Sequence, residues 1–323
     1  MKKATKVWLM IATVLLASGM LVFTLAMSMN GWSFSKLSTV QYTTNTHEIT
    51  EEFHSISMNT DTADILFLPS ESETCQVICY EEEKQTHTVT VQNGTLTVKK
   101  TNGEKWYDHI HIGVSFESPK ITVLLPKAEY DSLLIKESTG AISIPKDFLF
   151  ESIDITASTG DVRCDASAKG AVKIKTSTGS IRVENAVAEK MEISVSTGVV
   201  NVTSTACAGE LKIQVSTGKT SLTDIMCGSL FSSGDTGDLY LKNVIASGQF
   251  IIERDTGDVR FDGCDAAELS VTTDTGDVTG TLLTDKIFFA NSDTGKVDVP
   301  KTTTGGKCEI TTDTGKIEIA IQK

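Results

Sequence analysis

The amino-acid sequence predicts an all-β protein, a parallel β-solenoid (β-helix-like) of about ten 19–20-residue coils, preceded by an N-terminal transmembrane helix. Three observations predict this fold class. A Thr-Gly dipeptide recurs at nearly constant spacing, apolar and polar residues alternate around each copy, and a long uncharged segment lies near the amino terminus. A period near 20 residues is typical of solenoids, in which each repeat forms one coil and stacks on its neighbours.

Ten copies of the dipeptide define the repeat. Neighbouring copies are 19 or 20 residues apart, and their glycines are Gly140, Gly160, Gly179, Gly198, Gly218, Gly237, Gly257, Gly276, Gly295 and Gly315. The residue two positions before the glycine is serine in the first five copies and aspartate in the last five. Both side chains are short acceptors, so we expect an ST- or Asx-turn in each coil, with the glycine at positive φ.

The residues on either side of each glycine predict two strands per coil. The residue seven positions before the glycine is apolar in every copy, and the residue two positions after it is apolar in all but Thr220. Alternation with polar residues indicates strands with one buried face. About eight residues remain for the return to the next coil. A helical crossover needs a dozen or more, so the return is a loop or a third short strand.

The amino-terminal segment predicts a membrane anchor. Lys2, Lys3 and Lys6 precede a stretch without charge from Val7 to Met29. As a helix this stretch would be about 35 Å long, enough to span a bilayer. The lysines should remain in the cytoplasm, which makes the chain a single-pass cell-membrane protein with an extracytoplasmic carboxy-terminal body. A cleaved secretion signal is the alternative, and it also places the body outside the cytoplasm.

We divide the chain into four parts. Residues 1–30 hold the cytoplasmic lysines and the signal-anchor helix, 31–46 a linker, 47–132 an irregular β cap or start of the sheet, and 133–323 the ten-coil solenoid. Within the cap, Asn93-Gly94 is a hairpin signal. The last strand, 317–321, has no following cap. We expect its edge to be open, blunted by Lys316, Glu318 and Lys323 or paired with another copy of the chain.

Three segments resemble a known bacterial family. Residues 55–65, residues 121–127 and the Ser/Asp-Thr-Gly-Asp/Lys-Val ladder are similar to the "putative adhesin" β-strand-repeat domain of unknown function, in its membrane-anchored, Gram-positive form. The resemblance covers roughly residues 50–323. It implies a repeat architecture, often behind one amino-terminal membrane helix and in some members beside cell-envelope stress-response genes. It implies no catalytic residues.

These features favour a non-enzymatic cell-surface scaffold or adhesin-like interaction module without a cofactor. The expected partner is a protein or a cell-envelope polymer, and regulation of an envelope stress response is a variant of this function. The formal net charge of −13 argues against nucleic acid. The alternatives are a Ca²⁺-binding or self-assembling surface solenoid and a carbohydrate-active β-helix enzyme. The constant spacing disfavours the enzyme because it leaves no room for long loops.

The aspartates of the turns are the candidate metal ligands. Asp-Thr-Gly is also the signature of aspartic proteases, but repetition at a fixed period, interchangeable with Ser-Thr-Gly, indicates a turn. Coils six to eight read Asp-Thr-Gly-Asp, which predicts two stacked columns of carboxylates that Ca²⁺ could bridge. The residues are Asp235, Asp238, Asp255, Asp258, Asp274 and Asp277. Solvated turn residues are the alternative, and Lys296 and Lys316 indicate internal charge pairing in the last two coils.

Histidine and cysteine provide two further candidates. His109-x-His111, with Asp108 nearby, could hold a transition metal, or could lie on an exposed strand face. Most of the seven cysteines are expected to be small core residues. Cys75 and Cys79 would lie on one strand face about 13 Å apart, too far to bond. Cys207 and Cys227 occupy equivalent positions on adjacent coils, within disulfide range, and whether they bond is left open.

Overall fold

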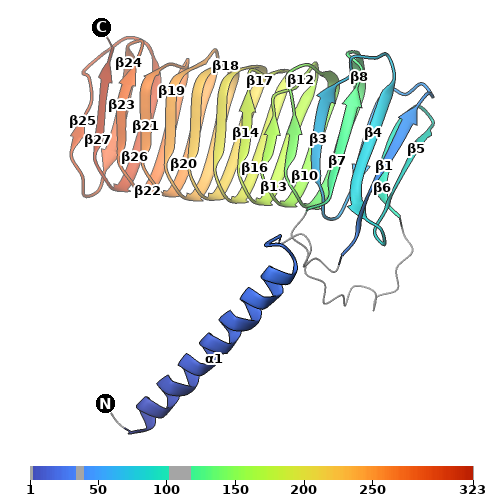
Figure 1. Ribbon diagram of the computed structural model, residues 1–323. Helices are drawn as coiled ribbons and strands as arrows, with labels where there is room; N and C mark the ends of the chain where they lie inside the picture. The colour runs from blue at the N-terminus through green and yellow to red at the C-terminus, as the bar shows by residue number, and fades with distance from the viewer. Residues whose placement is uncertain (1–2, 34–39, 102–117, 323) are drawn as a thin grey trace.

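The computed structural model describes residues 3–33, 40–101 and 118–322. Within these residues the chain has one helix, α1 (Lys3–Met29), and 27 strands that form one continuous sheet wound into a rod. Figure 1 shows the helix projecting from the end of the rod that holds the first strands. The helix from Thr5 to Met29 is long and apolar enough to cross a membrane, by length and composition alone. The predicted fold class is confirmed.

The strands fall into an amino-terminal group and a series of coils. The amino-terminal strands are β1 (Tyr42–Ile49), β2 (Ser55–Asn59), β3 (Asp64–Pro69), β4 (Cys75–Glu82), β5 (His87–Gln92), β6 (Thr95–Lys100) and β7 (Lys120–Leu125). The coil strands are β8 (Glu129–Thr139), β9 (Ile142–Ile144), β10 (Leu149–Thr159), β11 (Val162–Cys164), β12 (Ser167–Ala168), β13 (Ala171–Thr178), β14 (Ile181–Glu184), β15 (Val187–Ala188), β16 (Lys190–Thr197), β17 (Val200–Thr217), β18 (Thr220–Thr236), β19 (Leu239–Ala246), β20 (Gln249–Thr256), β21 (Val259–Cys264), β22 (Glu268–Thr275), β23 (Val278–Leu282), β24 (Lys286–Ser292), β25 (Val297–Asp298), β26 (Gly306–Thr314) and β27 (Ile317–Ile321).

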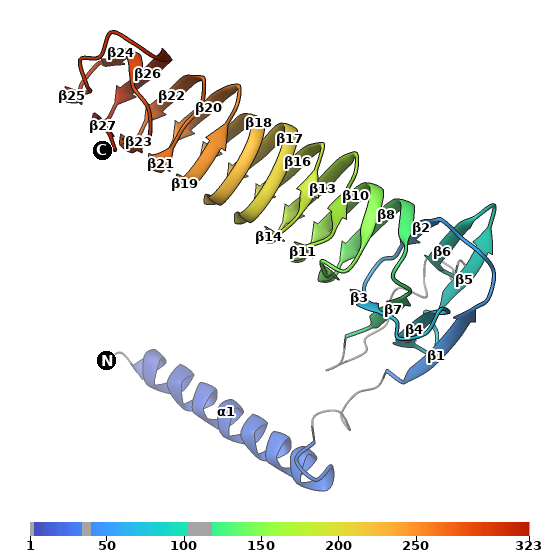
Figure 2. The same cartoon turned by 90° about the horizontal axis from the view of Figure 1, so that it is seen from above.

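The core of the rod consists of columns of equivalent side chains. Ile135 lies beside Ile155, which lies beside Ile174, and the column continues through Ile193 and Ile213, all fully buried. β-branched side chains pack well on the pleated face of a sheet, so each isoleucine supports the next. The return segments add short third strands, such as β12 and β15. Figure 2 shows the coils stacked side by side along the rod.

The turns are held by the backbone of the neighbouring coil, and the expected ST- and Asx-turns are wrong. The N–H of Gly140 donates to the carbonyl of Thr159, and the same bond repeats between Gly198 and Thr217. In eight of the ten copies the glycine has φ between 137° and 159°. A Cβ at the ten glycines would lie 1.7–2.3 Å from the backbone oxygen of the adjacent turn. Glycine is therefore required by close stacking as well as by φ.

One buried arginine explains why a polar residue, Ser232, occupies a core position that is aliphatic in the neighbouring coils. Arg254 is 4% exposed, and its Nη2 donates to Ser232 Oγ at 2.8 Å, while its Nη1 donates to the carbonyl of Glu253 at 2.9 Å. Burial lowers the pKa of Arg254 to about 10. The guanidinium passes over Gly234, where a Cβ would lie 3.0 Å from Nη1. Ser232 thus replaces an aliphatic residue because it binds the arginine of the next coil.

The last coil of the chain is not the last coil of the rod, so the expected open edge at 317–321 is wrong. β26 lies between β22 and β24, and β27 pairs with β23 on one side and with β25 on the other. The edge of the sheet is instead formed by β24 and β25. Gly305 and Gly306 allow the chain to pass between these two coils. A Cβ would lie 1.8 Å from Asp285 O at Gly305 and 1.7 Å from Ala267 O at Gly306.

At the amino-terminal end of the rod, a coil is likewise inserted between strands that do not follow it directly in the sequence. β2 pairs with β6 and β8, and β3 pairs with β7 and β9, so β2 and β3 form a further coil inside the stack. Its turn contains Ala63 where the other coils have glycine, which hid this coil from the repeat. Antiparallel pairs of β1 with β4, β4 with β7 and β5 with β6 end the sheet. The predicted hairpin at Asn93-Gly94 is confirmed, with φ of 51° and 72°.

Candidate functional site

The second column of turn aspartates binds the backbone of the neighbouring coil. Asp238 Oδ1 accepts the N–H of Asp258 at 3.1 Å, and Asp258 Oδ1 accepts the N–H of Asp277 at 2.8 Å. Asp277 Oδ1 in turn accepts the N–H of Lys316, which lies in the inserted last coil of the chain, at 2.9 Å. Hydrogen bonds from backbone amides stabilise a carboxylate. These three residues therefore have a structural role that explains their repetition.

The first column of turn aspartates is exposed to solvent. Asp235, Asp255 and Asp274 lie on successive coils, and insertion of the last coil places Asp313 beside Asp274. Lys296 pairs with Asp298 at 2.7 Å and Lys316 with Glu318 at 3.1 Å, which is the internal charge pairing expected for the last coils. The Ca²⁺ site at the six aspartates stays a prediction.

The other sequence candidates have different outcomes. Cys207 and Cys227 are direct neighbours in the register of β17 and β18, as expected, but both thiols are free. Cys207 Sγ donates to the carbonyl of Glu210 at 3.2 Å, and Cys227 Sγ lies 3.8 Å from the carbonyl of Ile245. All seven cysteines are buried and free. His109 and His111 lie outside the described residues.

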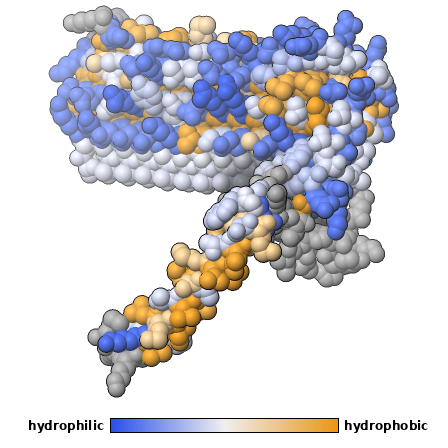
Figure 3. Space-filling view, viewed as in Figure 1, coloured by the Kyte–Doolittle hydropathy of each residue, from blue (hydrophilic) through white to orange (hydrophobic). Residues whose placement is uncertain are grey.

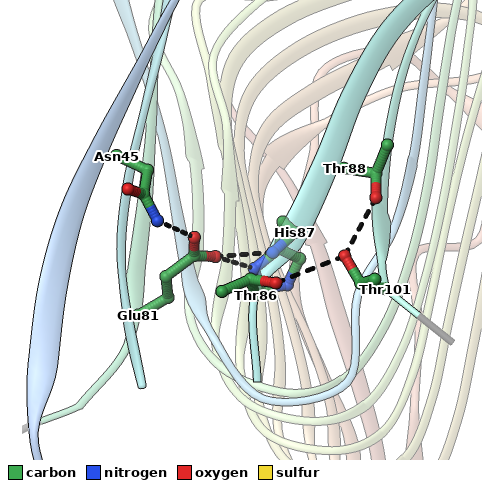
Figure 4. Close-up of polar contacts among 6 residues, drawn as sticks. All are labelled: Asn45, Glu81, Thr86, His87, Thr88 and Thr101. Carbon is green, nitrogen blue, oxygen red and sulfur yellow. Dashed lines mark hydrogen bonds and ion pairs between the residues drawn. The ribbon is translucent and has the colours of Figure 1, made fainter. Parts of the chain in front are cut away.

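A buried polar cluster in the amino-terminal strands was not found by sequence analysis (Figure 4). β4 points Cys75, Val77, Cys79 and Glu81 inward, because alternate residues of a strand share a face. Glu81 is 1% exposed and accepts three hydrogen bonds of 2.7 Å, from Asn45 Nδ2, from the backbone N–H of His87 and from His87 Nδ1. The carboxylate thus joins β1, β4 and the start of β5.

One nitrogen atom of this cluster has no hydrogen-bond partner. His87 is 8% exposed, and its Nε2 is buried without a hydrogen-bond partner. Cys79 is fully buried, and one ligand atom of each of Cys79, Glu81 and His87 lies within 4.8 Å of those of the other two. Burial, reinforced by the charge of Glu81, raises the pKa of the Cys79 thiol to about 12. The only sign of this cluster in the sequence was that Cys79 and Glu81 are two residues apart and therefore share one face of a strand.

His87 also lines a polar cavity of about 350 Å³ at the surface of this end of the rod. Asp61 and Lys100 form an ion pair of 3.2 Å in its wall, and Tyr42 and Glu82 complete one side. The cavity is small for a drug-sized ligand but large enough for an ion and its water molecules.

Glu137 is a buried carboxyl group at the turn beside this cavity. It is 4% exposed, its Oε1 accepts the N–H groups of Ala63 at 3.3 Å and Thr139 at 3.2 Å, and its Oε2 is buried without a partner. Burial raises the pKa of Glu137 to about 7, and the negative charge of Asp61 adds to the increase. The folded state therefore favours the protonated form more strongly than the unfolded chain does.

The free energy of unfolding should consequently depend on pH through Glu137. The contribution of a carboxyl group with a raised pKa is fully present below about pH 4.5 and is lost as pH rises through about 7. We expect Glu137→Gln to stabilise the protein by about 2 kcal/mol at pH 8 and by much less at pH 5. Chemical denaturation at both pH values measures this difference. Exposed Glu151→Gln is the control, and an equal effect of Glu137→Gln at both pH values would contradict the prediction.

The comparisons with known proteins agree with the architecture. The family model Toastrack DUF4097 matches residues 53–214 and 206–323. The chain belongs to this family. The two matches together cover residues 53–323, and the expected membership of a bacterial repeat-domain family of unknown function is confirmed. No curated protein sequence matches the chain.

The solved structures that match the chain include three from Parabacteroides species. A "putative lipid binding protein" from Parabacteroides distasonis is 15% identical, with a TM-score of 0.51 over 75% of this chain and 97% of that one. A "putative adhesin" from the same organism is 11% identical, with a TM-score of 0.49 over 87% and 98% of the two chains. A "putative adhesin" from Parabacteroides merdae is 14% identical, with a TM-score of 0.39 over 87% and 96%. At such identities the likeness to the first structure concerns the fold alone.

Proposed function

We propose that the chain is a non-enzymatic surface module, held in the cell membrane by α1, whose solenoid binds a partner outside the cytoplasm. The uncharged stretch of α1 from Val7 to Met29 and the lysines that precede this stretch support the anchor and its orientation. The first partner class to test is a membrane protein of a cell-envelope stress system, and an envelope polymer is the second.

One observation carries this proposal, an exposed apolar stripe on the return strands. Val187, Ala206, Met226 and Ile245 are direct neighbours in the register of β15, β17, β18 and β19. Val187 is 55% exposed and Met226 67% exposed. On the rod face seen in Figure 3, hydrophobic side chains also gather in patches among hydrophilic ones. Contiguous exposed apolar residues typically mark interaction surfaces, and a regular rod presents such a stripe over several coils.

Site-specific photo-cross-linking in intact cells tests this surface. A photoreactive residue at Met226 of the full-length chain should give a reproducible cross-linked species that Ile245→Glu abolishes. The same residue at exposed Thr272, which faces outward from the first strand of a different coil, is the matched control. Equal labelling from both positions, or no species from Met226, would contradict the proposal. The similar protein named for lipid binding makes cross-linked lipid one outcome to look for.

Self-assembly is a second candidate because the carboxy-terminal end of the rod is incompletely covered. Within the described strands β24 has a partner on one edge only. Ile287 is 37% exposed and Phe289 56% exposed there, and Phe288 packs only partly against the core. An exposed apolar edge strand can pair with another chain. A photoreactive residue at Phe289 that cross-links two copies of the chain would favour this candidate.

A further inference from the structure

We infer that Cys79, Glu81 and His87 form a binding site for a transition metal ion of the zinc class. The inference does not depend on the proposed surface function, because the cluster lies inside the amino-terminal strands and away from the apolar stripe. It rests on the spacing of the ligand atoms, on the burial of the cluster and on the cavity beside it.

The spacing suits a small ion. Around a tetrahedral zinc ion, with bonds of about 2.0–2.3 Å to nitrogen, oxygen and sulfur, neighbouring ligand atoms are about 3.3–3.8 Å apart. One ligand atom from each of the three residues already lies within 4.8 Å of the others. Side-chain rotation that widens the 2.7 Å contact of Glu81 Oε2 with His87 Nδ1 and shortens the longer distances by about 1 Å would complete the set. No large movement of β4 or β5 is needed.

The contact between Glu81 and His87 already brings two of the ligand atoms together. Glu81 Oε2 and His87 Nδ1 lie 2.7 Å apart, joined by a hydrogen bond that an ion between them would replace. The other carboxylate oxygen, Oε1, accepts from Asn45 Nδ2 at 2.7 Å, which holds the carboxylate in place. Carboxylates that bind a metal are commonly held by such a hydrogen bond from a neighbouring residue.

Charge also favours a divalent ion. The Cys79 thiolate and the Glu81 carboxylate together carry two negative charges, which such an ion neutralises in a buried place. The thiol proton is released when the ion binds. Sulfur and imidazole ligands select zinc-like ions over Ca²⁺ and Mg²⁺.

The cavity beside His87 provides access. Its wall contains the carboxylate of Glu82 beside the Asp61–Lys100 ion pair, and its volume of about 350 Å³ holds water molecules that can complete the coordination. A metal site with three protein ligands and one water has the open position that is typical of exchangeable zinc.

The test uses the full-length protein in detergent, reduced and freed of metal with a chelator. Co²⁺ is added as a spectroscopic substitute for Zn²⁺, because a thiolate ligand gives a charge-transfer band in the near ultraviolet. We expect this band in the wild type, its loss on addition of Zn²⁺, and a higher Tm with Zn²⁺ but not with Mg²⁺. A wild type with neither a band nor a Tm change overturns the inference.

Three variants assign the ligands. Cys79→Ala should abolish the cobalt band, and His87→Gln should weaken Zn²⁺ binding at least about tenfold. Cys75→Ala is the matched control, because Cys75 is a buried cysteine on the same face of the same strand, outside the cluster. A band that survives Cys79→Ala, or that Cys75→Ala removes equally, also overturns the inference. Circular dichroism checks folding, and His87→Gln carries the test if Cys79→Ala does not fold.

Discussion

Gly218→Ala is expected to destabilise the solenoid by more than about 4 kcal/mol, an unusually large effect for the addition of one methyl group. The new Cβ would lie 1.7 Å from the carbonyl oxygen of Gly198 in the adjacent turn, and Gly218 has a φ of 143°. The neighbouring turn cannot retreat, because Gly198 donates its own N–H to Thr217 in the strand that leads into this turn. Chemical denaturation of the full-length protein, followed by far-ultraviolet circular dichroism, measures the loss.

Two further glycines separate the effect of close stacking from the effect of φ. Gly94→Ala changes a residue with φ of 72° whose Cβ would have only a His54 carbon nearby, at 3.9 Å, so it should cost about 1 kcal/mol through φ alone. Gly276→Ala would place its Cβ 2.0 Å from Gly257 O without a left-handed φ, and should be almost as damaging as Gly218→Ala. If Gly218→Ala costs no more than Gly94→Ala, close stacking does not explain the glycines.

Deletion of residues 306–323 is expected to release two coils rather than one. β24 pairs with β26 over seven residues, from Lys286 to Ser292, and has no other partner among the described strands. Removing β26 therefore removes every interstrand hydrogen bond of β24, although β24 itself is still present. Hydrogen exchange in 286–299 should rise to rates near those of an unfolded chain, because the free energy of local opening falls toward zero.

Loss of protection in 286–299 is expected only if the last coil is inserted between two others. If coils stacked in sequence order, the deletion would remove only the last coil and leave 286–299 paired with β22. Continued protection of 286–299 would therefore contradict the expectation that the deletion leaves β24 without a partner. Deletion of 322–323 alone, which leaves every strand intact, is the control and should not alter exchange in this region.

Sequence patterns predicted the coils of the rod but not its ends. The Thr-Gly period and the alternation around it identified core residues such as Ile155 and Val200, because the position of a residue in a strand decides which face it occupies. The coil of β2 and β3 was assigned to an irregular cap because Ala63 interrupts the period. The turn bonds were misassigned because the side chains of Ser138 and Asp235 can make a local bond that the neighbouring backbone replaces.

The polar cluster was beyond prediction for a related reason. Glu81 and Asn45 are brought together by the antiparallel pairing of β1 and β4, and no local pattern in either strand specifies that register. Cys79 and His87 also lack the short spacing that marks a zinc motif. The pairing depends on how the strands before the solenoid cover its first coil.

The sequence by itself determined the coil as a unit, its glycine turn, its buried columns and the apolar helix before it, because these depend on local geometry and periodicity. The tertiary structure alone decided which coil stacks on which. Equivalent strands of a repeat offer nearly the same hydrogen bonds and the same buried face, so β22 could pair with β24 or with β26 by pattern alone. The choice depends on the lengths of the connections and on glycines, such as Gly305 and Gly306, that allow one coil to enter between two others.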